Sequence, residues 1–284
     1  MKTFREFLDL TEYGIERVPS SDYPGGKKAL GAADTPQSLS NIRPLPSHAG
    51  YGYTISTISS ETLICRLYDF QPEKHGYQDT THRYTDTERA QKDFTPSIGK
   101  LSVNKISTLR VNSAPLTLYQ ISSVTVDEQP VYRNKGLGLA MYLLLLRLPH
   151  VALVADAGQT PHGRKMWVKL AAHPEVQVDG MIRISDTDFE HDRHEKDGRT
   201  SLADTLFGTL GVDYLGVGKY NEPYTRFPSL DYRFFTFPVM SSELTNPAKK
   251  IKELMAVQKH PWTEIYRRKN LIDVSLIARL KNAL

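Results

Sequence analysis

Short stretches rich in β-branched and aromatic residues recur along the chain, and this pattern is typical of β-strands. They cover residues 51–58, 62–70, 97–111, 116–126, 151–156 and 231–238. The first two are close enough in sequence to form a hairpin. The stretch 97–111 fits either a pair of strands or one long bent strand, and 231–238 is expected to be the final strand.

Two apolar segments have helical character instead. Residues 137–148 are rich in strong helix formers and stop at Pro149, which cannot continue a helix. Thr160 is a good N-cap and Pro161 suits the first helical position, so a second helix is expected over 160–170. Each helix follows a predicted strand, so strands and helices are expected to alternate here.

The beginning of the chain has a different pattern. Residues 1–12 predict a short amphipathic helix with Phe4, Phe7 and Leu8 on one side. Residues 13–50 are crowded with Gly, Pro and Ser and predict an extended arm or linker. The opening helix buries too little surface to belong to a main core, so we expect it to be separable.

Three later segments complete the predicted organisation. Residues 71–96 are polar and aromatic without periodicity, as expected of a loop near a binding cleft, and 186–230 form an insertion. Residues 243–284 predict two helices broken at 260–262. The expected domains are therefore an N-terminal arm (1–50), a main domain (51–240) and a C-terminal helical extension (241–284).

Composition narrows the class of protein. With 284 residues and 39% hydrophobic positions, the chain can build one large or two small domains. The single cysteine, Cys65, excludes an internal disulfide framework, suits a reducing compartment and is expected to be structural. No apolar run reaches the roughly 18 residues of a membrane helix, and no signal-peptide pattern is present. The net charge of +4 argues weakly for an anionic ligand and against DNA wrapping.

The strongest chemical feature is the segment Arg133-Asn-Lys-Gly-Leu-Gly138, where a predicted strand leads into a predicted helix. The N–H groups of a first helical turn have no partner inside the helix and carry partial positive charge. Gly136 and Gly138 lack Cβ atoms, so a phosphate can approach the backbone, while Arg133 and Lys135 add positive charge. The turn is therefore expected to bind an anion, unless its glycines serve only packing.

Two other glycine motifs fail on inspection. A dinucleotide fingerprint needs a small residue where Met141 stands. A phosphate loop ending at Lys219 would need glycine at Asp213 and Ser or Thr at Tyr220. A third candidate, the cluster of acidic residues and histidines over 191–195, matches no standard zinc or calcium spacing and is expected to be a solvated loop.

The turn resembles the coenzyme A signature of the GNAT superfamily of N-acetyltransferases, which reads Arg or Gln, two residues, Gly, one residue, then Gly or Ala. Pro130-Val-Tyr132 is similar to the family's lead-in, and the strand at 151–156 followed by the helix at 160–170 is similar to its next feature. The similarity covers roughly residues 98–185. It implies a mixed α/β GNAT-like fold, a central twisted sheet flanked by helices and splayed where two parallel strands admit the pantetheine arm.

The resemblance also implies site residues. Acetyl-CoA is expected to contact a set drawn from the strand end, the turn and the second helix: Val124, Val126, Arg133, Asn134, Lys135, Gly136, Leu137, Gly138, Thr160 and Gly163. Asp127 and Glu128, beside the turn, are the expected proton acceptors for an attacking amine. The family's usual proton-donating tyrosine is replaced by Trp167, whose indole is a poor acid. No metal is expected.

Three functions remain open at this stage. The first is N-acetyl transfer from acetyl-CoA to an amine on a protein, a nucleic acid or a small molecule, by direct attack in a ternary complex. The second is a GNAT-fold protein that is catalytically weak or inactive and serves as a virion or interaction protein. The third is an unrelated α/β binding module. Residues 1–12 resemble capsid-targeting peptides of tailed phages, and Leu10-Thr-Glu12 fits their protease site. A phage origin would place the protein in the host cytoplasm or in the virion, with virion proteins as partners.

Overall fold

The computed structural model describes residues 42–46, 48–59, 61–78, 95–111, 114–156, 160–186, 211–219, 231–240, 242–244 and 272–281. Several predictions fall outside these ranges. They are the helix at 1–12, most of the arm at 13–50, the cluster at 191–195, most of the insertion at 186–230 and the first of the two C-terminal helices.

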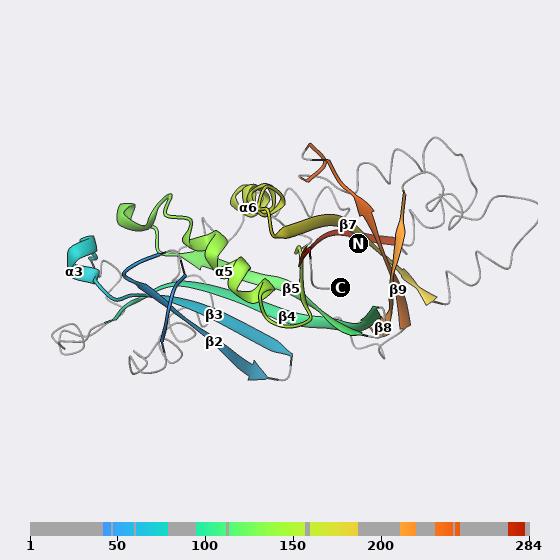
Figure 1. Ribbon diagram of the computed structural model, residues 1–284, viewed down its shortest axis with the longest axis horizontal. Coiled ribbons are helices and arrows are strands. Elements are labelled where there is room, and N and C mark those ends of the chain that lie inside the picture. Colours follow the sequence, from blue (N-terminus) through green and yellow to red (C-terminus); the bar gives the residue numbers. More distant parts are fainter. Residues whose placement is uncertain are drawn as a thin grey trace, which may run out of the picture. The chain divides into compact units, whose positions relative to one another are not determined.

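Ten strands form one mixed sheet in the described part of the chain, in the order β1-β2-β3-β4-β5-β6-β10-β7-β9-β8 (Figure 1). The strands are β1 (Arg43–Pro44), β2 (Tyr51–Ser59), β3 (Thr62–Asp69), β4 (Ser97–Val111), β5 (Ala114–Val126), β6 (Val151–Val154), β7 (Val176–Ser185), β8 (Asp213–Lys219), β9 (Asp231–Pro238) and β10 (Ile272–Leu280). The helices described are α3 (Pro72–His75), α5 (Leu137–Leu146) and α6 (Pro161–Ala171), with the 3-10 turn η2 (Pro130–Tyr132).

The parallel pair β5 and β6 organises the middle of the chain. A parallel pair needs a crossover connection, and α5 supplies it. The ladder with β6 spans Thr117 to Gln120 of β5, whereas β5 itself continues to Val126. Directly after β6, the Ala155 N–H donates to the Leu276 carbonyl of β10 at 2.9 Å. Strand β6 itself pairs with β10 through Leu153 and Val154, so this bond continues a pairing that β6 has already made.

The contacts divide the chain into two compact units. The first contains Met1–Val103 and Ser122–Leu145, and the second contains Asn104–Ile121 and Leu146–Leu284. The first unit includes the hairpin of β2 and β3, in which Tyr51 pairs with Asp69.

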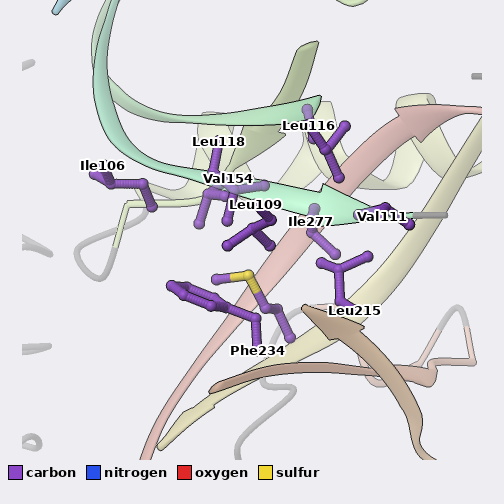
Figure 2. Packing of buried hydrophobic residues seen from close by; sticks show 11 residues of the cluster. Ile106, Leu109, Val111, Leu116, Leu118, Val154, Leu215, Phe234 and Ile277 are labelled. Carbon is purple, nitrogen blue, oxygen red and sulfur yellow. The ribbon is translucent and has the colours of Figure 1, made fainter. Parts of the chain in front are cut away.

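In the second unit, β10 enters between β6 and β7 and is antiparallel to both. Strands β7, β9 and β8 continue as antiparallel neighbours, and α6 packs beside β7. Side chains from the two ends of this strand order point toward one another in a single apolar core (Figure 2). This core consists of Ile106, Leu109, Val111, Leu116, Leu118, Ala152, Val154, Met181, Leu215, Phe234 and Ile277.

The sheet of the second unit coils so far that β8 lies against β4. A Cβ placed on Gly218 would lie 2.7 Å from Cδ2 of Leu109 and 3.0 Å from the Thr108 carbonyl oxygen. On Gly216, which has φ +151°, it would lie 3.1 Å from the Arg110 carbonyl oxygen. These glycines, in the motif that fails as a phosphate loop, therefore permit close packing of strands.

The predicted GNAT-like fold, with helices flanking a central sheet, is wrong. The described residues form mainly a ten-stranded mixed sheet, and their helices are limited to α3, α5, α6 and the turn η2. Part of the predicted C-terminal helical extension is strand β10, so β9 is not the last strand. In β10, apolar residues follow the two-residue period of a strand at Ile272, Val274, Leu276, Ala278 and Leu280.

Several local predictions are confirmed. Strands β2 and β3 pair as a hairpin, and β4 is one long strand over 97–111. Strand β5 ends at Val126 as predicted, and α5 follows the glycine-containing turn. Helix α6 starts behind Thr160, whose Oγ1 accepts the Gly163 N–H at 3.1 Å.

Candidate functional site

The turn between η2 and α5 has the backbone geometry of an anion cradle. Asn134 and Gly136 both adopt positive φ, +58° and +76°, with Lys135 between them. Left-handed residues are a common feature of turns whose backbone N–H groups form anion-binding nests. Ala140 donates to the Gly136 carbonyl at 3.0 Å, so the N–H groups of residues 137–139 precede this first helical bond.

Two basic side chains flank the cradle. Arg133 and Lys135 are exposed, and Arg133 Nε donates to the Glu128 carbonyl at 2.9 Å. This bond holds the guanidinium group next to the turn. His48 supports the turn from the N-terminal side, since its Nε2 lies 2.9 Å from the Lys135 carbonyl oxygen. A Cβ on Gly136 would lie 3.5 Å from the same Nε2.

The segment before the turn is held by a network of side-chain hydrogen bonds. Asp127 Oδ1 accepts the Gln129 N–H at 3.1 Å, and the Asp127 N–H donates to the Ile98 carbonyl at 2.7 Å. Gln129 also forms a reciprocal pair with the backbone of Gln78: its Oε1 accepts at 2.8 Å and its Nε2 donates at 2.7 Å. The segment after α3 is thereby fastened to the loop that leads into the turn.

A buried carboxylate, that of Asp69, lies at the end of β3, shortly before α3 begins. The Asp69 side chain is 0% exposed, and three donors reach it, each at 2.8 Å. The Gln71 N–H and His75 Nδ1 contact Oδ1, and the Tyr132 hydroxyl donates to Oδ2. A buried carboxylate is tolerated when donors satisfy it in this way. Asp69 thus joins β3, α3 and η2 within the first unit.

Aromatic rings enclose this carboxylate. Tyr51 stacks on the His75 imidazole with centroids 4.9 Å apart and planes 13° apart, and Tyr132 meets Tyr51 edge-on at 6.4 Å. Burial raises the pKa of Tyr132, and the bond to Asp69 and the charge of Asp69 raise it further. Burial and the charge of Asp69 likewise raise the pKa of Tyr51. Both phenols are therefore neutral near neutral pH, and Tyr132 keeps its donor proton.

The predicted site residues fall into two groups. Val124, Val126, Asp127, Glu128 and the whole turn from Arg133 to Gly138 belong to the first unit. Thr160 and Gly163 belong to the second unit, where they cap α6 together.

Trp167, on α6, is 1% exposed and is part of the packing of the second unit. Of the two predicted proton acceptors, the Asp127 side chain is half-buried and bonded to Gln129, and Glu128 is exposed. None of these observations tests the chemical roles predicted for Trp167, Asp127 and Glu128, so those roles stay predictions.

Sequence reasoning missed Asp69, His75 and His48. Asp69 and Tyr132 are separated by 63 positions, and His48 and Lys135 by 87, so no local spacing connects them. His75 lies in a segment without periodicity, where a single histidine gives no signal. An available clue was the position of Asp69 at the end of an apolar strand, next to the loop expected near a binding cleft.

Searches with family models, curated proteins and solved structures return no match for this chain. Across the described ranges, no group of three or more His, Cys, Asp or Glu side chains is arranged to hold a metal ion. Within those same ranges, no helix is both long enough and apolar enough to cross a membrane.

Proposed function

We propose that this protein binds acetyl-CoA at the turn Arg133–Gly138 and transfers the acetyl group to an amine. The observation that carries the proposal is the turn itself. Gly136 has positive φ, the first N–H groups of α5 have no partner within the helix, and Arg133 and Lys135 lie beside them with exposed basic side chains. The proposal depends on this local chemistry, not on the fold of the transferase superfamily.

The turn suits a pyrophosphate better than a single small anion. A helix N-terminus carries about half a positive charge and binds phosphate through its free N–H groups. Arg133 and Lys135 add two further charges, one on each side of Asn134. A diphosphate group spreads its charge over several oxygens, so it can use both the backbone cradle and the flanking cations.

The end of β5 supports the placement of the pantetheine arm. This strand continues past Gln120, where its ladder with β6 stops, up to Val126. Val124 is 37% exposed, and its strand leads through Asp127 to the turn. The pantetheine arm carries two amide groups, and an extended backbone is a good partner for amides because it offers alternating donors and acceptors.

The proposed reaction is a direct attack. The acceptor nitrogen attacks the acetyl carbonyl carbon, the C–S bond breaks, and the sulfur leaves as the thiolate. Holding amine and thioester together supplies much of the rate through proximity. Trp167 is buried and its indole is a poor acid, so the thiolate takes its proton from water. The amine acceptor belongs to a protein, a nucleic acid or a small molecule, and the reducing cytoplasm suits the single cysteine.

The test combines binding with turnover. Calorimetry with CoA and acetyl-CoA should give one site per chain, and thiol release should follow when a panel of primary amines is added. Mass spectrometry of the amines should show a gain of one acetyl group. Absence of CoA binding would refute the proposal. Binding without thiol release from any amine would refute transfer and favour a protein that only carries or recognises the cofactor.

A further inference from the structure

Helix α6, in the second unit, presents a basic face to solvent. The helix contains no acidic residue and three basic ones, Arg164, Lys165 and Lys169. Trp167 and Leu170 are buried, and on that side the helix packs beside β7 (Figure 1). Lys165 and Lys169 are exposed and lie together on the side away from β7, because residues four positions apart share one face of a helix.

The cations of α6 are not neutralised by the protein. In the part of the chain that the structure describes, no hydrogen bond or ion pair involves the side chain of Arg164, Lys165 or Lys169. Several other arginines of the second unit form ion pairs with carboxylates, namely Arg147 with Glu175, Arg233 with Asp186 and Arg279 with Asp179. The positive charge of α6 is therefore available to an anionic partner.

These charges do not stabilise the helix itself. Lys165 and Lys169 form a like-charge pair four residues apart, an arrangement that destabilises a helix. Arg164 lies close to the N-terminal end, where the helix dipole disfavours a cation, and only Lys169 lies in the last turn, where a cation is favoured. Charges that work against their own helix are expected where function requires them.

The composition of this face favours duplex DNA over other anionic partners. Cores of protein–protein interfaces are rich in aromatic residues and poor in lysine, whereas the large apolar side chain that α6 exposes is Val168, at 40%. Single-stranded nucleic acids are held by stacking on aromatic side chains, and Trp167 is buried. The major groove of duplex RNA is too narrow for side chains, but that of B-form DNA admits an α-helix.

We propose that α6 binds the phosphate backbone of duplex DNA through Arg164, Lys165 and Lys169. The two lysines are about 6 Å apart along the helix axis, so they can contact neighbouring phosphates. Lysine binds phosphate as a point charge, and contacts to phosphates position a protein without reading the base sequence. The contact is confined to one helix face, which agrees with a net charge of only +4. It does not depend on acetyl transfer, because the turn belongs to the first unit.

The experiment measures binding of the full chain to a short, fluorescently labelled DNA duplex of arbitrary sequence, by anisotropy at several salt concentrations. Each phosphate that the protein neutralises contributes about −0.9 to the slope of log K against the logarithm of the salt concentration. Three contacts should therefore give a slope of about −2.7 for the wild-type protein. Duplexes of unrelated sequence should bind equally well.

A Lys165→Gln/Lys169→Gln variant removes two of the three charges and keeps good helix formers at both positions. Its slope should fall to about −0.9, and its affinity at low salt should drop at least about tenfold. An Arg110→Gln/Lys219→Gln variant is the matched control, because it loses the same charge from exposed positions of β4 and β8 in the same unit. The control should keep the wild-type slope, and so should Lys165→Arg/Lys169→Arg, which preserves the charges.

Thermal unfolding provides an independent check. The glutamine variant should be at least as stable as wild type, because a like-charge pair is removed and no protein partner is lost. Lower stability would show that these lysines have partners in the folded protein, and would contradict the proposal. The proposal is also wrong if wild type does not bind the duplex at low salt, or if the glutamine variant and its control lose equal affinity. Tighter binding of single-stranded DNA, or displacement of the duplex by polyglutamate as effective as by unlabelled duplex, would overturn the choice of partner.

Discussion

At the scale of the residue, burial decides which groups can react. Cys65 and Asp69 are both 0% exposed, yet Asp69 contacts a partly exposed histidine whereas Cys65 is enclosed. Burial raises the pKa of the Cys65 thiol to about 12, which keeps it protonated. A thiol reacts as the thiolate, so Cys65 is inert in the folded protein. The sequence prediction of a structural cysteine agrees with this burial.

We predict that Cys65 resists alkylation at pH 8 until the protein unfolds. Because the thiol pKa is raised in the folded state, the native protein holds this proton more tightly than the unfolded chain. The stabilisation is present below pH 9 and is lost as the pH rises from about 9 toward 12, by at most about 1.4 kcal/mol per pH unit. A Cys65→Val variant should show a shallower alkaline decline in its unfolding free energy. Rapid labelling of native protein would contradict the prediction.

At the scale of the element, the second unit depends on how closely its strands pack. Gly216 and Gly218 have no side chains where β8 meets β4, and apolar side chains of both strands pack in the core of the second unit. Gly180 plays a similar part on β7, where a side chain would overlap the ring of its cross-strand partner Phe237. Small residues in strands are therefore structural requirements here.

Gly218→Ala is predicted to destabilise the protein by about 1–3 kcal/mol, because the added methyl group would overlap Ser107 Oγ and crowd the Thr108 carbonyl. Val217→Thr is the control: Val217 is 45% exposed on the same strand. The denaturation midpoint of the glycine variant should drop, whereas the free energy of unfolding of the control should stay within about 0.5 kcal/mol of the wild-type value. Equal stability of the glycine variant would mean that β8 does not lie against β4.

At the scale of the whole molecule, local structure could be predicted from the sequence, whereas the pairing of strands far apart in the chain could not. The hairpin, the long strand β4, the turn and the cap of α6 each follow from residues within a few positions of one another. The insertion of β10 between β6 and β7 depends on partners far apart in the chain, such as Leu276 with Gly180. The apolar residues of β10 alternate as in a strand, but the segment 243–284 that contains it also fits helices.

The candidate site likewise has a part that could be predicted from local sequence and a part that depends on long-range contacts. The turn from Arg133 to Gly138 could be singled out from the sequence because its charges and glycines are contiguous, and anion binding there stays a prediction. Asp69, His75 and Tyr132 meet only after β3 and η2 are brought together by folding, so their grouping had no sequence signal. The predicted fold is wrong because the resemblance covered only residues 98–185, whereas strands outside that range, among them β8 and β10, join the same sheet.

Binding of a pyrophosphate at the turn can be tested with two substitutions at Gly136. Asparagine and aspartate have nearly the same shape and both tolerate positive φ, so they differ mainly in charge at this position. In calorimetric titration with acetyl-CoA, Gly136→Asn should retain binding, and Gly136→Asp should weaken it at least a further tenfold, about 1.4 kcal/mol. Equal affinities of the two variants would contradict binding at this turn.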